Sequence, residues 1–167
     1  MLLLLWFADS LWKNNIISNP VIEKKTFASI IISARNEENN LPSLLQALKN
    51  QSYPQNKYEI IIANDRSTDN SLKILKKWKS KIPNLSIVDI QETPIDWAPK
   101  KWALNQAINK SKGSIIILTD ADCKPLANWI EVIINTFEHN ENIGLVSAPS
   151  PLTNAQTLLD DIFEIDS

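Results

Sequence analysis

Three short apolar runs divide the chain, and each contains three consecutive isoleucines. The runs begin at Ser29, Glu59 and Ser114, and each is followed by Asn or Asp. Continuous β-branched runs of this length, bounded by turn-forming residues, are typical of parallel strands that are buried on both faces. The pattern therefore predicts three buried parallel strands with a polar cluster after each one.

Between these strands, apolar residues recur at the spacing of amphipathic helices. One helix is expected after Asn39 and one after Asp69, because both side chains are suitable N-caps. Lysines near the end of the second helix suit its dipole. Two further helices are expected over residues 101–110, ending near Gly113, and over residues 126–138.

Residues 85–90 and 143–148 supply two more candidate strands, and residues 153–166 carry a weak helical pattern. Strands and helices then alternate along the chain, which predicts the α/β class with helices flanking a mostly parallel sheet. The chain has 167 residues, 44% of them hydrophobic and 22% charged, which is enough for one domain with a sizeable core. We assign residues 26–167 to this domain.

Residues 1–25 form a separate apolar N-terminal segment. Its leucine run is shorter than the roughly 20 residues that span a bilayer, and it lacks the charged leader of a secretory signal. One interpretation is the stub of a longer hydrophobic segment, or an interfacial helix that presents Leu2, Leu5, Trp6 and Trp12 to lipid. The other is a helix that packs on the domain, or a disordered end.

Charge and cysteine content exclude some classes of function. The chain has 17 basic and 19 acidic residues, so it offers no basic face for nucleic acid. A single cysteine, Cys123, excludes an internal disulfide and a structural zinc site with paired cysteines, and it fits a reducing compartment. Cys123 follows Asp122, so it is either a soft extra metal ligand or a small buried residue.

Polar side chains follow all three isoleucine strands. Ligands of open α/β sheets bind beyond the carboxyl ends of the strands. We therefore expect one edge of the sheet to gather six polar residues: Asn36, Glu37, Asp65, Asp69, Asp120 and Asp122. Asp69 has a second interpretation as a helix N-cap.

Asp120 and Asp122 are separated by one residue, so an extended chain directs both side chains to the same face. Two carboxylates about 5 Å apart repel by roughly 3 kcal/mol at an effective dielectric of about 20, which favours a bound cation. Carboxylate and phosphate oxygens are typical ligands of magnesium or manganese. The alternative is that Asp120 caps a turn and Asp122 is solvated. The lysines at 100 and 101 are either counter-charges for a phosphate or solvated surface residues.

Five motifs then occur in an order that resembles a known family. They contain the strings SARNEENN, QSYP, ANDRSTDN, KKWALNQAI and TDADC, the last followed by PLANWI. Together they cover about residues 26–150 and resemble the N-terminal half of family 2 glycosyltransferases. The resemblance implies the GT-A fold, which is Rossmann-like. It also implies inverting transfer of a sugar from a nucleotide-sugar donor, here expected to be a UDP-sugar, with Mg²⁺ or Mn²⁺ bridging the diphosphate.

The resemblance assigns nine residues to the nucleotide-sugar site: Ala34, Arg35, Asn36, Glu37, Asp65, Ser67, Lys100, Asp120 and Asp122. The first four resemble the loop that flanks the nucleotide. Asp65 is similar to the family aspartate that recognises the base. Asp120 would lie near the ribose and diphosphate, and Asp122 would be the metal ligand of the Asp-x-Asp motif, with Asp120 beside it. Lys100 occupies the family's Gly-Lys element, although Pro99 replaces the glycine and its backbone freedom.

The family's general base, an aspartate in an acidic pair, is expected beyond Ser167, because the last acids of the chain lie in a helical pattern without that motif's surroundings. The domain is therefore expected to be truncated at its C-terminus. We expect a metal-assisted glycosyltransferase of polysaccharide or glycolipid synthesis, membrane-associated at the cytoplasmic face. The alternatives are a donor-binding or vestigial fragment without turnover, and a nucleotidyltransferase. A glycine-rich phosphate loop, which nucleotidyltransferases usually carry, is not recognisable in a chain with two glycines.

Overall fold

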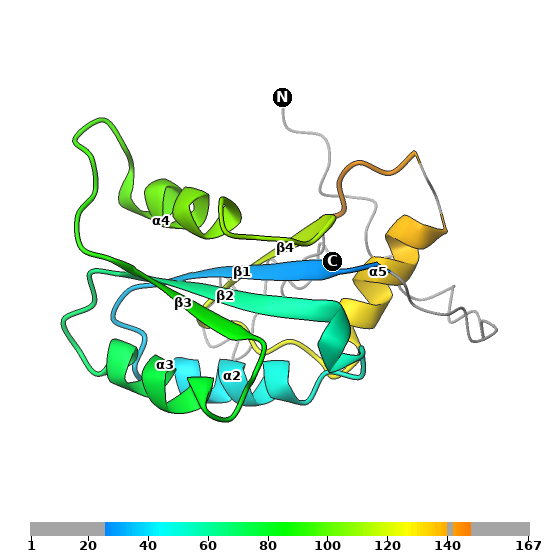
Figure 1. Cartoon of the computed structure of the whole chain (residues 1–167), viewed down its shortest axis with the longest axis horizontal. Helices are drawn as coiled ribbons and strands as arrows, with labels where there is room; N and C mark the ends of the chain where they lie inside the picture. Colours follow the sequence, from blue (N-terminus) through cyan, green and yellow to red (C-terminus); the bar gives the residue numbers. More distant parts are fainter. Residues whose placement is uncertain (1–25, 140–141, 148–167) are drawn as a thin grey trace, which may run out of the picture. The chain divides into compact units, whose positions relative to one another are not determined.

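A computed structural model of the chain describes residues 26–139 and 142–147 (Figure 1). Residues 26–139 lie within one compact unit, Lys24–Glu141, and residues 142–147 belong to a second unit. The apolar segment 1–25 and the helical pattern over 153–166 lie outside the described residues. In the part of the chain that is described, no helix is long and apolar enough to cross a membrane.

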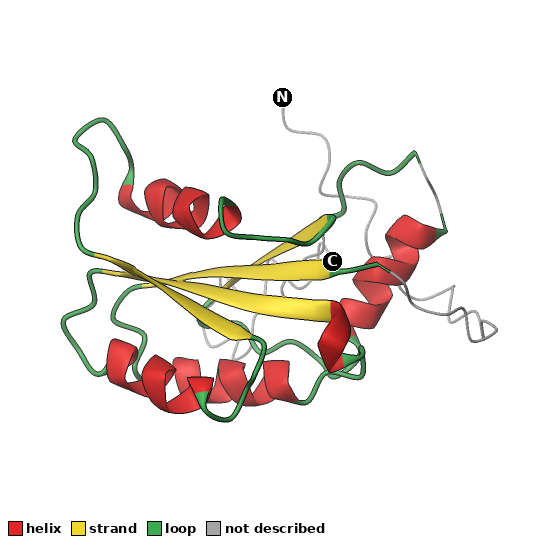
Figure 2. Ribbon diagram, viewed as in Figure 1, coloured by secondary structure: helices red, strands yellow, loops and turns green. Residues whose placement is uncertain are grey.

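Strands and helices alternate through the larger unit, as the sequence predicts (Figure 2). The strands are β1 (Ala28–Ala34), β2 (Tyr58–Asp65), β3 (Leu85–Ile90) and β4 (Ile115–Asp120). The helices are α2 (Leu41–Lys49), α3 (Ser71–Lys79), α4 (Pro99–Ile108) and α5 (Trp129–Glu138), with a 3-10 turn η1 (Gln55–Lys57). This confirms the α/β class and the mostly parallel sheet.

The four described strands form one parallel sheet in the order β3-β2-β1-β4. From β1 the chain moves outward to β2 and β3, and it then returns to the other side of β1 to form β4. The order therefore reverses between β1 and β4. In an open α/β sheet, the crevice beyond the carboxyl ends of such neighbouring strands is the usual place for a ligand.

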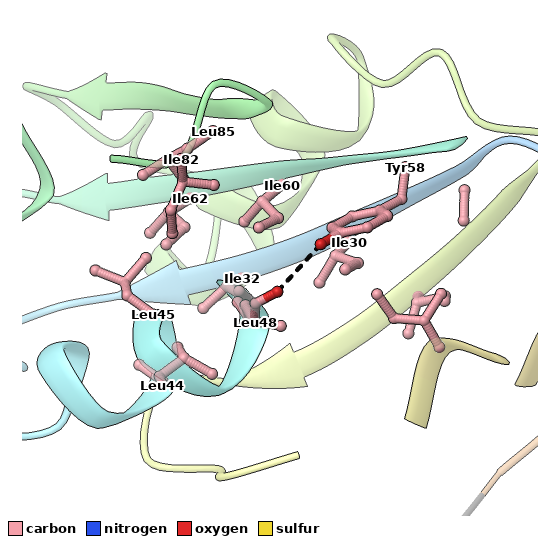
Figure 3. Close-up of a cluster of buried hydrophobic side chains, with 14 of the residues drawn as sticks. Ile30, Ile32, Leu44, Leu45, Leu48, Tyr58, Ile60, Ile62, Ile82 and Leu85 are labelled. Carbon is pink, nitrogen blue, oxygen red and sulfur yellow. Dashed lines mark hydrogen bonds between the residues drawn. The ribbon is translucent and has the colours of Figure 1, made fainter. Parts of the chain in front are cut away.

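Alternate residues of the central strands supply two cores, one on each face of the sheet. Ile30 and Ile32 of β1 join the core that α2, α3 and α5 cover, whereas Ile31 joins the core beneath α4. Figure 3 shows the first core, where the Tyr58 hydroxyl donates a hydrogen bond of 3.1 Å to the carbonyl oxygen of Leu48. Helices cover both faces of the sheet here, which explains why β1 and β2 are continuously apolar along their isoleucine runs.

The third isoleucine strand, β4, differs from the prediction of burial on both faces. Ile117 is buried on the α2 side, but Ile116 and Leu118 are 42% and 55% exposed. β4 is the last strand of the described sheet on this side, and α4 packs against β1, β2 and β3. The α4-side face of β4 therefore lacks the cover that Ile31 receives.

The predicted strand over residues 143–148 is wrong for the described residues 143–147, which form no strand. The predicted helix starts and caps also shift. The N-cap residues of α2 and α3 are Asn40 and Asn70, one position after the predicted Asn39 and Asp69. The helix predicted over residues 101–110 begins at Pro99, because proline is well suited to the first helical position. The helix predicted over residues 126–138 begins at Trp129.

Gly113 has a different role from the predicted helix end. α4 ends at Ile108 with Asn109 as its C-cap, and Gly113 lies beyond it, before β4. A Cβ atom at Gly113 would lie 2.4 Å from the backbone nitrogen of Ser29. The N–H of Gly113 also donates a 2.8 Å hydrogen bond to the Ser29 hydroxyl. Glycine is required here because the two backbones approach closely.

Candidate active site

A cavity of about 310 Å³ opens beyond the carboxyl ends of β1 and β4, where the strand order reverses. Ten residues line it: Ser33, Ala34, Arg35, Glu37, Asp65, Pro99, Lys100, Asp120, Ala121 and Asp122. Seven of them are among the nine residues that the sequence assigns to the nucleotide-sugar site. A second hollow, lined by Gln55, Asn56, Pro83 and Asn84, contains no charged residue among the described residues that line it. The first cavity is therefore the candidate site.

Separate elements bring these side chains together. The register places Ser33 of β1 opposite Asp120 of β4, so the ends of both strands reach the cavity at the same level. Asp65 is the last residue of β2. Lys100 lies in the first turn of α4, directly after Pro99. Residues from motifs that are far apart in the sequence therefore lie together at one edge of the sheet.

Lys100 and Asp120 form an ion pair across the cavity, with 2.8 Å between Nζ and Oδ1. The hydrogen bond that Lys100 donates to Asp120 raises the pKa of Lys100. The nearby carboxylates of Asp120 and Asp122 add to that effect against the opposing cost of burial. Both side chains are more than half exposed. Exposed pairs contribute at most about 1 kcal/mol to stability, so this pair contributes little to the stability of the fold.

The cavity carries more negative than positive charge. Four carboxylates, from Glu37, Asp65, Asp120 and Asp122, face two cations, Arg35 and Lys100. Like charges repel in such a site, so an anionic diphosphate is favoured only if a cation enters with it.

The acidic pair at the end of β4 fits a hard divalent cation. Among the described residues, no group of three or more His, Cys, Asp or Glu side chains is arranged to hold a metal. Mg²⁺ typically takes one or two protein carboxylates and completes its shell with phosphate oxygens and water. Asp120 and Asp122 are both exposed and line the cavity, which suits a cation that is held jointly by the protein and a ligand.

Asp65 is buried, and its carboxylate is held by the next residue along the chain. Nε of Arg66 donates to Oδ1 at 2.8 Å and Nη2 donates to Oδ2 at 3.3 Å. Arg66 has a φ of 51°, in the left-handed region that favours glycine. This pair lies at the wall of the cavity that β2 supplies, and the sequence analysis did not assign a role to Arg66. The signal in the sequence is an arginine directly after a strand-ending aspartate.

Asn36 and Ser67, which the resemblance also assigned to the site, do not line the cavity as the described residues define it. They join two loops instead. The backbone N–H of Asn36 donates to the Ser67 hydroxyl at 3.0 Å, and the Asn36 Oδ1 accepts from the backbone N–H of Thr68 at 2.8 Å. The loop after β1 is thereby fixed to the loop after β2. This connection positions Arg35 and Glu37, the cavity residues of the loop after β1.

Asp69 takes part in the same loop connection, and its carboxylate also accepts a hydrogen bond at the start of α3. This contact is similar to the predicted N-cap role, although the N-cap residue is Asn70. Its Oδ1 accepts from the backbone N–H of Ser71, the first residue of α3, at 2.9 Å. Burial by itself would raise the pKa of Asp69. Hydrogen bonds from the Ser71 hydroxyl and from the backbone N–H groups of Ser71 and Glu38 outweigh burial, and the pKa lies below its usual value.

These features agree with the comparison with known proteins. The family model for glycosyl transferase family 2 matches residues 29–153, which include the whole cavity lining. The chain belongs to this family. Four of the five motifs that carry the family resemblance, all except QSYP, contribute residues to the cavity lining, and the fold is GT-A.

Several curated relatives of this family 2 chain span most of its length. Glycosyltransferase AglE of Haloferax volcanii is 33% identical over 110 residues, which is 66% of this chain and 35% of AglE. Beta-monoglucosyldiacylglycerol synthase of Nostoc sp. is 30% identical over 130 residues, 78% of this chain and 27% of the synthase. The probable glycosyltransferase YdaM of Bacillus subtilis is 29% identical over 93% of this chain and 36% of its own length. The chain thus spans about a third of the length of these relatives.

Two solved structures show the same fold. TarS of S. aureus, residues 1–349, superimposes with a TM-score of 0.62 at 21% identity over 75% of this chain and 39% of that one. The mannosyltransferase PcManGT of Pyrobaculum calidifontis, solved with GDP-Man and Mn²⁺, has a TM-score of 0.57 at 25% identity. The superposition includes 80% of this family 2 chain and 37% of PcManGT.

Proposed function

We propose that this chain binds a nucleotide-sugar donor, with a UDP-sugar as the expected ligand, and contributes the donor half of an inverting glycosyltransferase. The observation that carries this proposal is the meeting of Asp65, Lys100, Asp120 and Asp122 at one cavity beyond the switch point of the sheet. The names of the relatives support sugar transfer, and that of one of them refers to a glycolipid.

Each cavity residue has a distinct task in this proposal. The buried carboxylate of Asp65 accepts hydrogen bonds from N–H groups of the base. Lys100 exchanges its bond to Asp120 for a phosphate oxygen of the donor, because a lysine ammonium is charged at neutral pH and attracts the anionic diphosphate. Asp120 and Asp122 hold a divalent cation, Mg²⁺ or Mn²⁺. When bound, that cation stabilises the negative charge that develops on the leaving diphosphate.

Inversion also requires a general base that removes the proton of the acceptor hydroxyl. We assign this role to none of the described residues. We also keep the cytoplasmic face of a membrane as the proposed location, because glycolipid acceptors reside in membranes and one relative is named for such a product. Polysaccharide and glycolipid synthesis remain the proposed processes.

A second candidate function is donor binding without turnover. It is favoured by the cavity lining, whose carboxylates and lysine suit donor and metal binding but to which we assign no general base. The two functions differ in product formation. Binding of a UDP-sugar with Mn²⁺ followed by transfer or hydrolysis supports the enzyme, whereas binding without product supports the second function.

The decisive experiment is isothermal titration of the chain with UDP in the presence and absence of Mn²⁺, repeated with Asp122→Ala. We expect the parent to bind UDP only when Mn²⁺ is present and Asp122→Ala to lose this dependence together with binding. Asp96→Ala, at an exposed acid in the loop before α4, is the matched control and should bind like the parent. Equal binding of UDP and Mn²⁺ by parent and Asp122→Ala would show that the metal assignment is wrong.

A further inference from the structure

Arg66 forms a left-handed turn directly after the end of β2. In an extended strand, neighbouring side chains point to opposite faces, so Asp65 and Arg66 could not face each other if β2 continued. A φ of 51° at Arg66 breaks this alternation directly after the last strand residue. The turn brings the guanidinium back onto the carboxylate of the residue before it.

The backbone at Arg66 is held in this unusual state by its surroundings. Its N–H lies 3.2 Å from the carbonyl oxygen of Asn64 and 3.3 Å from that of Ile90, at the end of β3. Glycine adopts a positive φ without steric cost, whereas arginine does not. A strained residue at the edge of a ligand site is a reason to look for a function in its side chain.

The side chain makes a two-point contact with Asp65. Arginine presents its N–H groups as a planar fork that matches a carboxylate and fixes its orientation. The Asp65 side chain is 6% exposed and that of Arg66 is 30% exposed. Asp65 lines the cavity, and Arg66 is absent from the described residues that line it. The guanidinium therefore holds the carboxylate from outside the cavity.

This arrangement leaves Asp65 able to bind a ligand. An ionised carboxylate has about four acceptor sites on its two oxygens, and the two bonds from Arg66 use one on each oxygen. The remaining sites accept hydrogen bonds and donate none. A carboxylate whose orientation is fixed in this way selects a base that presents an N–H group, as uracil and guanine do, over one that presents a ring-nitrogen acceptor, as cytosine does.

We propose that Arg66 is a positioning residue for base recognition, which acts through Asp65 and makes the site select N–H-presenting bases. This proposal rests on the proposed function, because it assumes that a nucleoside diphosphate occupies the cavity. It goes further in naming how the base is selected and which residue outside the cavity sets that selection.

The test uses Arg66→Gly in the full chain, because glycine tolerates the left-handed turn and the fold should keep its melting temperature. We expect UDP affinity with Mn²⁺ to fall about tenfold, the effect of a loss of roughly 1.4 kcal/mol. The ratio of UDP to CDP affinity should fall by a similar factor. Arg66→Lys, which keeps the charge but not the fork, should lie between Arg66→Gly and the parent.

A double-mutant cycle with Asp65→Ala distinguishes positioning from direct contact. If Arg66 acts through Asp65, adding Arg66→Gly to Asp65→Ala should weaken UDP binding no further. Additive losses would mean that Arg66 contacts the ligand itself, and a lower melting temperature of Arg66→Gly would mean that the arginine only supports the loop. Either result overturns the positioning role. Unchanged UDP affinity in Arg66→Gly overturns it while the proposed function stands, whereas a parent that binds neither UDP nor GDP overturns both.

Discussion

Asp69 and Glu38 join two loops that are far apart in the sequence. Oδ2 of Asp69 accepts a hydrogen bond of 3.1 Å from the backbone N–H of Glu38. In return, the Glu38 carboxylate accepts from the backbone N–H and the side-chain amide of Asn70, at 2.9 and 2.8 Å. Each loop thus supplies an acid that bonds to the backbone of the other. These bonds fix the relative position of the loops after β1 and β2. The loop after β1 supplies Arg35 and Glu37 to the cavity, and β2 ends at Asp65 in the cavity wall.

The first prediction concerns the pH dependence of stability at Asp69. Its pKa is lower in the folded state than in the unfolded state, so its carboxylate stabilises the fold above the unfolded pKa of about 3.9. This stabilisation is lost as the pH falls through the lower folded pKa. Asp69→Asn should therefore be less stable than the parent at pH 7, and the difference in the free energy of unfolding should shrink below about pH 4. Urea denaturation at several pH values measures both.

Asp96→Asn is the control for this prediction, because Asp96 is an exposed acid outside the loop connection. Its stability should follow that of the parent at every pH. A stability difference between parent and Asp69→Asn that stays constant from pH 7 to pH 3 would contradict the assigned role of the ionised carboxylate.

The sequence predicted the layers of the fold better than the ends of its elements. The isoleucine runs located β1, β2 and β4, because continuous β-branched residues have few alternatives to a buried strand. The helix starts moved by one to three residues, since capping depends on hydrogen bonds between loops that local sequence does not reveal. The burial of β4 was wrong on one face. Periodicity indicates what a strand can bury, and the neighbouring elements decide what is covered.

The sequence predicted those site residues that are charged and lie next to the predicted end of a strand or start of a helix. Asp65, Lys100, Asp120 and Asp122 meet at one cavity because parallel strands end at one edge. Arg66 escaped prediction because its contact requires a positive φ that an arginine rarely adopts. The roles of Asn36 and Ser67 in joining loops also depend on tertiary contacts.

The second prediction concerns the lysine of the candidate site. Lys100→Ala should weaken UDP binding about tenfold or more, because hydrogen bonds to charged groups contribute about 1.5–3 kcal/mol. The melting temperature should change little, since the Lys100–Asp120 pair is exposed. Isothermal titration and thermal denaturation measure the two effects. Lys101→Ala, next along the chain and also exposed, should bind UDP like the parent. If both variants lost affinity equally, general positive charge would explain binding and Lys100 would have no special role.

The third prediction uses two register partners on the same face of the sheet, Ile31 of β1 and Leu118 of β4. Ile31 is fully buried beneath α4, whereas Leu118 is 55% exposed. Ile31→Ala should cost about 2–5 kcal/mol of unfolding free energy through lost burial and a cavity. Leu118→Ala should cost less than about 1 kcal/mol. Urea denaturation of both variants measures the difference, and equal losses would show that β4 is covered in solution.

The last prediction concerns the close approach at Gly113. A Cβ atom there would lie 2.4 Å from the backbone nitrogen of Ser29 and 2.7 Å from both the Ala28 carbonyl carbon and the Ser29 hydroxyl oxygen. Two of these atoms belong to the backbone of β1, so relief requires moving a central strand and not a flexible side chain. Gly113→Ala should therefore lower the unfolding free energy by about 1–3 kcal/mol, as overpacking usually does.

Gly144→Ala is the matched control, because a Cβ atom at Gly144 meets nothing within 4 Å. It should leave the unfolding free energy within about 0.5 kcal/mol of the parent. Thermal and urea denaturation of the two variants compare the same chemical change at a crowded and an open position. If Gly113→Ala were as stable as Gly144→Ala, the connection between α4 and β4 would not need to approach β1 closely, and the hydrogen bond from Gly113 to Ser29 would not fix the start of β4.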